Sequence, residues 1–265
     1  MSTLVFRLMN FPIQRRDLLP YALITAWVLS MISLPIALWT IGDEALAYST
    51  TASVLLLASA SAVLMSKAWG WPRAVQSGLT IMLLGWGIEF IGSRTGFPFG
   101  SYSYTQSLQP QLFGVPLLIP LAWMMMMPPA WAVAQCMVGH HRLAFVVTSA
   151  LAFTAWDMFL DPQMVNWGFW VWHDPGTWNY FGIPFMNFAG WLLAAILMTS
   201  VVRPPLLPRA VLAPLLTIYG ITIFLQTIGV GMFWSMPGAA LCGFVAMTAC
   251  FIPALKRYLK QHNVA

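Results

Sequence analysis

Eight long apolar segments constrain what this chain can fold into more than any other feature of its sequence. An apolar segment of about 20 residues matches the hydrocarbon core of a bilayer, which is roughly 30 Å thick. Because 60% of the 265 residues are hydrophobic and only 7% are charged, no water-soluble domain of this size could bury such segments. We expect an all-α integral membrane protein with about eight transmembrane helices, forming one polytopic membrane domain over residues 1–265. The segments lie near residues 18–40, 45–66, 74–93, 112–137, 143–161, 182–202, 210–229 and 235–255.

The basic residues predict how these helices are oriented. If the first helix starts in the cytoplasm, 11 of the 12 Lys and Arg residues fall in cytoplasmic segments and only Arg94 faces outward. Since basic loops stay on the cytoplasmic side, both termini are expected in the cytoplasm and the protein in the cell (inner) membrane. The stretch 1–17 is expected to be a cytosolic lead-in rather than a signal peptide. Anionic lipid of the bilayer accounts for the net charge of +5 without a nucleic-acid partner.

Two stretches of the chain, 68 positions apart, align without a gap and indicate an internal repeat. The matched pairs are Glu89 with Asp157, FGSYSY (99–104) with WGFWVW (167–172), and GVP (114–116) with GIP (182–184), followed by Trp123 and Trp191. Each copy is a helix that ends in an acid, an aromatic loop, and a helix started by proline.

The repeat predicts how the middle helices are arranged. A pair of helices returns the chain to its starting side, so helices 3–4 and 5–6 are expected to form a parallel repeat about an axis along the membrane normal. Small residues allow close helix packing in lipid. We therefore expect Gly85, Gly87 and Gly92 to let helix 3 pack closely against helix 5.

Three acidic residues, Glu89, Asp157 and Asp161, fall inside predicted transmembrane helices. An aspartate facing lipid at the membrane centre costs about 3 kcal/mol, so the three are expected to face the bundle interior near the outer interface. Asp157 and Asp161 share one helix face, and Pro162 is expected to end that helix directly after them. Burial, mutual repulsion and the helix dipole then favour at least one protonated acid.

The residues leave two other roles for these acids open. They could cap neighbouring helices or pair with Arg94, or they could hold Mg²⁺ through their oxygen atoms. A magnesium–diphosphate site needs several basic residues, and the outer face offers only Arg94, while His140 and His141 lie on the opposite side. The sequence also lacks a glycine-rich nucleotide fingerprint. We expect no metal site and no cofactor.

Tryptophan and tyrosine crowd the loops beside the acids. Such residues collect at membrane interfaces whatever the function, but their rings also stabilise a cation held in a pocket. The candidate substrate-binding residues are Tyr102, Tyr104, Trp156, Trp167 and Trp170, with Asn187 and Arg94 as polar contacts.

Four motifs resemble the carotenoid biosynthesis membrane proteins that include the carotenoid 1,2-hydratases of γ-carotene and bacterioruberin pathways. They are EFIGSRTGFPFGSYSYT (89–105), GVPLLIPLAW (114–123), WDMFLDPQM (156–164) and YFGIPFMNFAGW (180–191), within a motif-bearing core of residues 85–191. The resemblance implies a hydrophobic carotenoid substrate and addition of water, without a cofactor, across the terminal C1=C2 double bond of a ψ end group. It also implies carotenoid-pathway enzymes as partners.

Hydration of such an alkene needs an acid, a base and walls that tolerate a tertiary cation. We assign Asp157 as the general acid, Asp161 as the partner that helps it retain its proton, and Glu89 as the residue that positions the water; the roles can be exchanged. Three alternatives remain: a Mg-dependent isoprenoid transferase or isomerase, a non-catalytic carotenoid-binding protein, and a proton-coupled transporter.

Overall fold

The computed structural model describes residues 18–139 and 141–263. Within these ranges, eight helices are long and apolar enough to cross a membrane, which confirms the predicted number. The helices are α2 (Leu18–Ile41), α3 (Glu44–Trp69), α4 (Trp71–Thr95), α5 (Leu118–Val138), α6 (Arg142–Asn166), α7 (Phe185–Val202), α8 (Arg209–Ile228), which the π-helical turn η2 (Gly229–Phe233) extends, and α9 (Pro237–Asn263). The basic residues Arg7, Arg15 and Arg16 of the expected lead-in, and His140, lie outside the described ranges.

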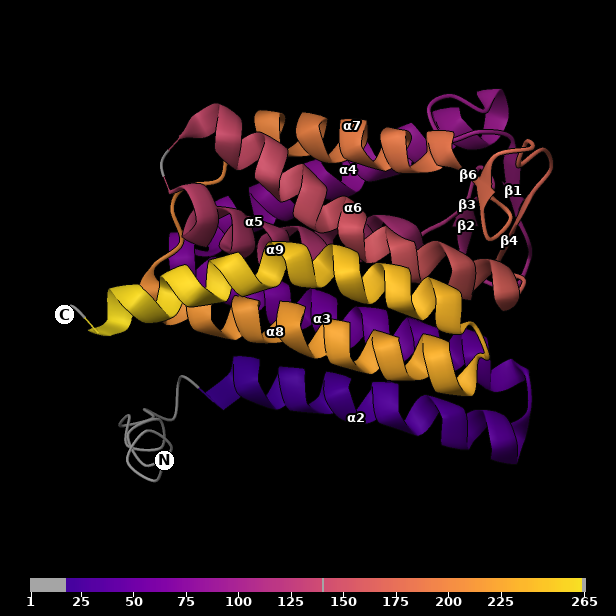
Figure 1. The fold of residues 1–265 in the computed structure, drawn as a ribbon, viewed down its shortest axis with the longest axis horizontal. Helices are drawn as coiled ribbons and strands as arrows, with labels where there is room; N and C mark the ends of the chain where they lie inside the picture. The colour runs from indigo at the N-terminus through magenta and orange to yellow at the C-terminus, as the bar shows by residue number, and fades with distance from the viewer. Residues whose placement is uncertain (1–17, 140, 264–265) are drawn as a thin grey trace.

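The helices run side by side, and short strands gather at one end of the bundle (Figure 1). We call this the strand end and the opposite end, where the described part of α9 finishes, the basic end. Of the Lys and Arg residues that the structure describes, only Arg94 lies at the strand end. The strands pair as β1 (Tyr102–Tyr104) with β4 (Trp170–Trp172), β2 (Gln111–Leu112) with β3 (Val115–Pro116), and β5 (Asn179–Tyr180) with β6 (Ile183–Pro184).

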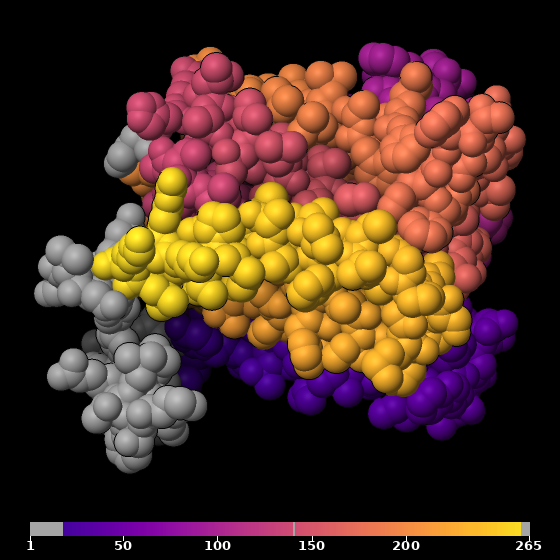
Figure 2. Space-filling model, viewed as in Figure 1, coloured from indigo at the N-terminus to yellow at the C-terminus, as the bar shows by residue number. Residues whose placement is uncertain are grey.

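The outer surface of the bundle is apolar. In the space-filling view α9 covers the middle of one face and α2 lies along its lower edge (Figure 2). Leu241 and Val245 on α9, and Leu29 and Ile36 on α2, are exposed. Exposed aliphatic side chains along two helices suit contact with lipid chains rather than with water.

Helix α6 does not end before Pro162, as the sequence predicted, but continues to Asn166. Proline lacks the N–H group that would bond to the carbonyl four residues earlier, here that of Met158. The Tyr180 hydroxyl donates a hydrogen bond to this carbonyl at 2.9 Å. Burial raises the pKa of Tyr180, so its hydroxyl keeps the proton that it donates. The Tyr180 hydroxyl, from β5, therefore supplies a hydrogen bond that allows α6 to continue past Pro162.

Tyr180→Phe is expected to destabilise the protein, because the part-buried Met158 carbonyl would lose its donor. Loss of one such bond costs about 1–3 kcal/mol, which should lower the thermal unfolding midpoint of the protein in detergent. Tyr48→Phe removes the same atom from an exposed tyrosine and should leave the midpoint unchanged. Equal midpoints for the two variants would show that α6 does not depend on this bond.

Helix α4 packs against α3, α5 and α7, and not closely against α6 as its glycines suggested. Aromatic rings occupy the space beside two of these glycines instead, while a side chain at Gly87 would meet nothing within 4 Å. A side chain at Gly85 would meet the ring of Trp123, and one at Gly92 would meet Phe99 and Tyr102. The small residues of α4 therefore make room for rings at the strand end of the bundle rather than for a neighbouring helix.

Two prolines expected in the first turns of helices lie just before them. Pro116 is in β3, two residues before α5 starts, and Pro184 is in β6, directly before α7. Each follows a glycine with positive φ, Gly114 or Gly182, at the turn of its hairpin. The GVP and GIP motifs thus form the second strands of two short hairpins that lead into helices.

Candidate functional site

The three acids of the transmembrane helices are buried near the strand end. Glu89 is 4% exposed, Asp161 2% and Asp157 0%. Glu89 and Asp161 line one small cavity, which we call the acidic cavity; Asp157, one turn earlier on α6, lies behind its wall. The other residues that line this cavity are Phe99, Tyr102, Tyr104, Ile119, Ala122, Trp123, Leu160, Trp170, Trp172, Asn187 and Trp191.

Glu89 is surrounded by hydrogen-bond donors. The hydroxyls of Tyr102 and Tyr104 donate to Glu89 Oε2 at 2.6 and 2.7 Å, and the indole N–H of Trp123 donates to Oε1 at 3.3 Å. Burial and the charge of Glu89 raise the pKa of both tyrosines, so the phenols keep their protons and act as donors. An ionised carboxylate can only accept hydrogen bonds, and these three groups donate hydrogen bonds to it.

Asp157 and Asp161 form one unit with Asn187 of α7. The side-chain amide of Asn187 donates to Asp157 Oδ2 at 2.9 Å and also to Asp161 Oδ2. The indole N–H of Trp170 donates to Asp161 Oδ1 at 2.7 Å. Asp157 Oδ1 is buried and has no hydrogen-bond partner among the described residues. Two carboxylates held by one amide nitrogen away from water form a site suited to sharing a proton.

Aromatic rings surround the acids. The rings of Trp123 and Trp191 stack with centroids 4.5 Å apart, and Phe153 stacks on both at 5.0 and 5.4 Å. On the side of the strands, the Tyr102 ring lies 5.0 Å from that of Trp172. Ring faces carry partial negative charge and attract cations. The acidic cavity therefore combines proton-carrying groups with walls that stabilise positive charge.

A second, largely apolar cavity adjoins the acidic cavity among α2, α3, α5, α6 and α8. Ile119, Ala122, Leu160 and Trp170 line both, so they separate the two spaces. The volume of this apolar cavity is about 80 Å³, which is small for a long polyene. Flexible side chains in its wall, such as Met125 and Met126 of α5, can adapt to such a chain. An apolar chain can thus lie here with one end next to the acids.

The structure brings together most residues that the sequence placed at the site. Those that line the acidic cavity are Glu89, Asp161, Tyr102, Tyr104, Trp170 and Asn187. Trp156 and Trp167 line the apolar cavity instead. Arg94 lines neither: its guanidinium lies 4.4 Å from the centroid of the Phe90 ring and donates to the Phe113 carbonyl at 3.4 Å.

Three tryptophans of the acidic cavity were missing from the predicted site: Trp123, Trp172 and Trp191. A signal for them was present in the sequence. Trp123 and Trp191 occupy matching positions in the two copies of the repeat, and Trp172 matches Tyr104. Matching aromatic residues that persist in two copies of a helix pair indicate a shared task more strongly than membership of an interfacial belt.

The described residues contain no group of three or more His, Cys, Asp and Glu side chains placed to hold a metal ion. The carboxylate oxygens face N–H and O–H donors, such as Tyr102, Trp170 and Asn187. Metal ligands instead direct lone pairs at one point. The contacts of the acids are hydrogen bonds from these protein donors.

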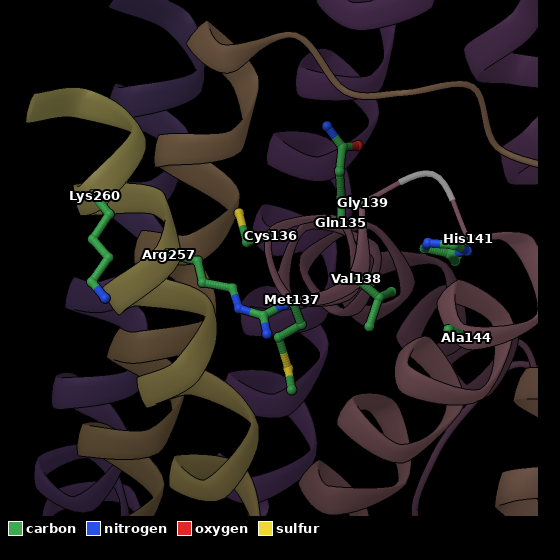
Figure 3. A pocket seen from close by; sticks show the side chains of 9 residues that line it. All are labelled: Gln135, Cys136, Met137, Val138, Gly139, His141, Ala144, Arg257 and Lys260. Atoms are coloured by element: carbon green, nitrogen blue, oxygen red, sulfur yellow. The ribbon is translucent and has the colours of Figure 1, made fainter. Parts of the chain in front are cut away.

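A third cavity is open and lies at the basic end, away from the acids. Figure 3 shows it where α5 ends, with His141 on one side and Arg257 and Lys260 of α9 on the other. Its residues lie at the opposite ends of α5 and α6 from the acidic cavity, or on α9, which does not line that cavity. It is therefore not part of the candidate site.

Comparison with known proteins identifies the family to which the chain belongs. A family model described as carotenoid biosynthesis protein matches residues 48–250. A bisanhydrobacterioruberin hydratase of Haloarcula japonica is 34% identical over 126 residues, 46% of this chain and 42% of that protein. The match thus spans less than half of the relative's length. No solved structure matches. Residues 48–250 are more than half of the 265-residue chain and include all three acids, so the protein belongs to the carotenoid biosynthesis protein family.

Proposed function

We propose that this protein is a carotenoid hydratase that adds water across the terminal C1=C2 double bond of a ψ end group, without a cofactor. One observation carries the proposal: Glu89, with three donors, and Asp161, which Asn187 links to Asp157, line one cavity walled by aromatic rings. An apolar cavity adjoins it. The hydratase named among the relatives supports the same class of reaction.

Asp161 delivers the proton in this proposal, because it lines the acidic cavity while Asp157 does not. The π electrons of the double bond form the new C–H bond at the less substituted carbon, C2, and a tertiary cation remains at C1. The aspartate pair is left with one more negative charge. Asn187 keeps its hydrogen bonds to both carboxylates and so stabilises that charge.

Glu89 acts as the base. A lone pair of the water oxygen forms the C–O bond at C1, and the proton that this oxygen loses passes to Glu89, which leaves a neutral tertiary alcohol. Tyr102 and Tyr104 hold the carboxylate in place for this step. One proton has then moved from the aspartates to the substrate and one from water to Glu89. A proton returns from Glu89 to the aspartates before the next cycle.

The proposed activity can be tested by expressing the protein in cells that accumulate lycopene or γ-carotene. The pigments are expected to gain the mass of one water molecule for each ψ end group that reacts. Cells that express Asp174→Asn, which changes an acid in a loop at the strand end, should make the same products. Pigments of unchanged mass, in cells whose membranes contain the protein, would contradict the hydratase function.

We also propose that α4–α5 and α6–α7 form a parallel repeat about an axis along the bundle. Residues separated by 68 positions contact one another: the Trp131 indole donates to the Thr199 hydroxyl at 3.0 Å. In the pairing of β1 with β4, Ser103 lies opposite Val171, which is also its match in the repeat. Contacts between matched positions are expected on a two-fold axis. The matching acids of α4 and α6 would then approach one cavity from two sides.

The strand end is proposed to face the outside of the cell membrane, with both termini in the cytoplasm. The described basic residues support this orientation, since all but Arg94 lie at the basic end. Alkaline phosphatase joined to the C-terminus should be inactive, and phosphatase joined after Gly176, in the loop between β4 and β5, should be active. The reverse pattern of activities would show that the protein has the opposite orientation in the membrane.

A further inference from the structure

Among the polar groups that line the apolar cavity, three are buried without a hydrogen-bond partner among the described residues and take no part in the proposed hydration. Gln163 and Trp167 lie one helical turn apart at the end of α6, and Thr50 belongs to α3. Gln163 is 4% exposed and Thr50 8%. Gln163 Oε1, Trp167 Nε1 and Thr50 Oγ1 are all buried, and none has a hydrogen-bond partner among the described residues. Buried polar groups are nearly always bonded, so three around one cavity indicate a ligand that bonds to them.

The chemistry of the three groups selects the kind of ligand. The Gln163 oxygen only accepts a hydrogen bond, the Trp167 nitrogen only donates one, and the Thr50 hydroxyl does both. An alcohol oxygen donates and accepts, so it is complementary to each of them. A ketone or ether oxygen cannot donate and would leave Gln163 Oε1 unpaired. No charged side chain lines the described wall of this cavity, so an ionic ligand has no counter-charge there.

The rest of the cavity wall defines the remainder of the ligand. Most of its side chains are aliphatic, sulfur-containing or aromatic, among them Leu34, Leu57 and Met126. The ligand therefore combines a long apolar body with a hydroxyl group. Since Leu160 and Trp170 line both cavities, one molecule can reach the polar groups and the acids together.

We propose that Thr50, Gln163 and Trp167 form a hydroxyl subsite, which binds an alcohol group that the isoprenoid substrate carries before it is hydrated. The inference rests on the proposed function, because it takes the ligand of the apolar cavity to be the substrate of the acids. It predicts that, among carotenoids with a ψ end group, those that already bear a hydroxyl bind more tightly than hydrocarbons do. The alcohol formed by hydration arises in the acidic cavity and is a different group.

Binding of a matched pair of compounds tests the subsite directly. Lycopene and lycopene carrying one hydroxyl near one end are added to the full-length protein in detergent, and quenching of tryptophan fluorescence gives each affinity. Wild-type protein is expected to bind the alcohol about tenfold more tightly, the effect of about one hydrogen bond. Gln163→Leu and Thr50→Val should each reduce this ratio severalfold. Thr248→Val, which alters another buried threonine without a partner, should leave the ratio unchanged.

Measurements on the same protein preparation distinguish a failure of the hydroxyl subsite from a failure of the hydratase function. Equal affinities for the two compounds in wild-type protein would overturn the hydroxyl subsite, whether or not the protein hydrates them. Variants that weaken binding of both compounds alike would overturn it too, since the three groups would then affect binding without recognising the hydroxyl. Failure of wild-type protein to hydrate either compound would overturn the hydratase function, while the ratio of affinities still tests the subsite.

Discussion

Asp161→Asn is expected to lower the rate of hydration by about 100- to 10,000-fold, the usual contribution of a general acid. Asparagine keeps the shape of the side chain and can still accept the hydrogen bond from Trp170, but it has no proton to give. Asp157→Asn should cause a large loss as well, because the two carboxylates share one site through Asn187. Turnover is measured as hydrated pigment per unit of protein in membranes.

Which of the two variants, Asp161→Asn or Asp157→Asn, loses more of the hydration rate distinguishes the roles of the two aspartates. From the sequence alone, Asp157 was assigned as the general acid and Asp161 as the partner that helps it retain its proton. The position of Asp161 in the cavity wall reverses this expectation. Asp174→Asn is the matched control and should retain full activity. Near-wild-type turnover of both Asp157→Asn and Asp161→Asn would show that the pair is not the proton source.

Glu89→Gln is expected to be the second severe change, with a loss of at least about 100-fold in hydrated product. The amide retains hydrogen bonding to Tyr102 and Tyr104 but cannot take the proton from water. Protonation by Asp161 remains available, so the cation should form and return to an alkene. In deuterated water the Glu89→Gln variant should therefore place deuterium in the recovered substrate, which Asp161→Asn should not do.

Glu44→Gln is the control for Glu89→Gln, since it makes the same change at an exposed position in the first turn of α3. It should hydrate at the wild-type rate. If Glu89→Gln also does so, Glu89 is not the base. If Asp161→Asn exchanges deuterium and Glu89→Gln does not, the assigned acid and base are exchanged.

The sequence predicts the helices well because the bilayer sets their length, and it fails where a distant partner overrides a local rule. Pro162 ends a helix by local rules, but the Tyr180 hydroxyl supplies the bond that proline cannot. Gly85 and Gly92 suggest a close helix neighbour, but the rings of other segments fill that space. The local sequence does not show whether a small residue makes room for a neighbouring helix or for an aromatic ring.

The candidate site was partly predictable for a similar reason. A carboxylate inside a membrane is costly, so Glu89, Asp157 and Asp161 were identified from composition alone. Trp156 was placed with them because it is adjacent in sequence, yet adjacent helical residues point about 100° apart, and Trp156 lines the other cavity. Arg94 was chosen for its charge and lies over Phe90. Three of the donors that hold the acids, Tyr102, Tyr104 and Trp170, come from the segments between helices, whose paths depend on the whole fold.

The source of the product's oxygen tests the central claim most directly. The proposed chemistry takes the hydroxyl oxygen from water and changes no oxidation state overall. Turnover in ¹⁸O-labelled water, without oxygen gas or a reductant, is expected to proceed and to yield a tertiary alcohol whose oxygen is labelled. Mass spectrometry of the pigment before and after the reaction gives the label content. Label that arrives from ¹⁸O₂, or a reaction that stops without oxygen and a reductant, would contradict hydration by Glu89, Asp157 and Asp161.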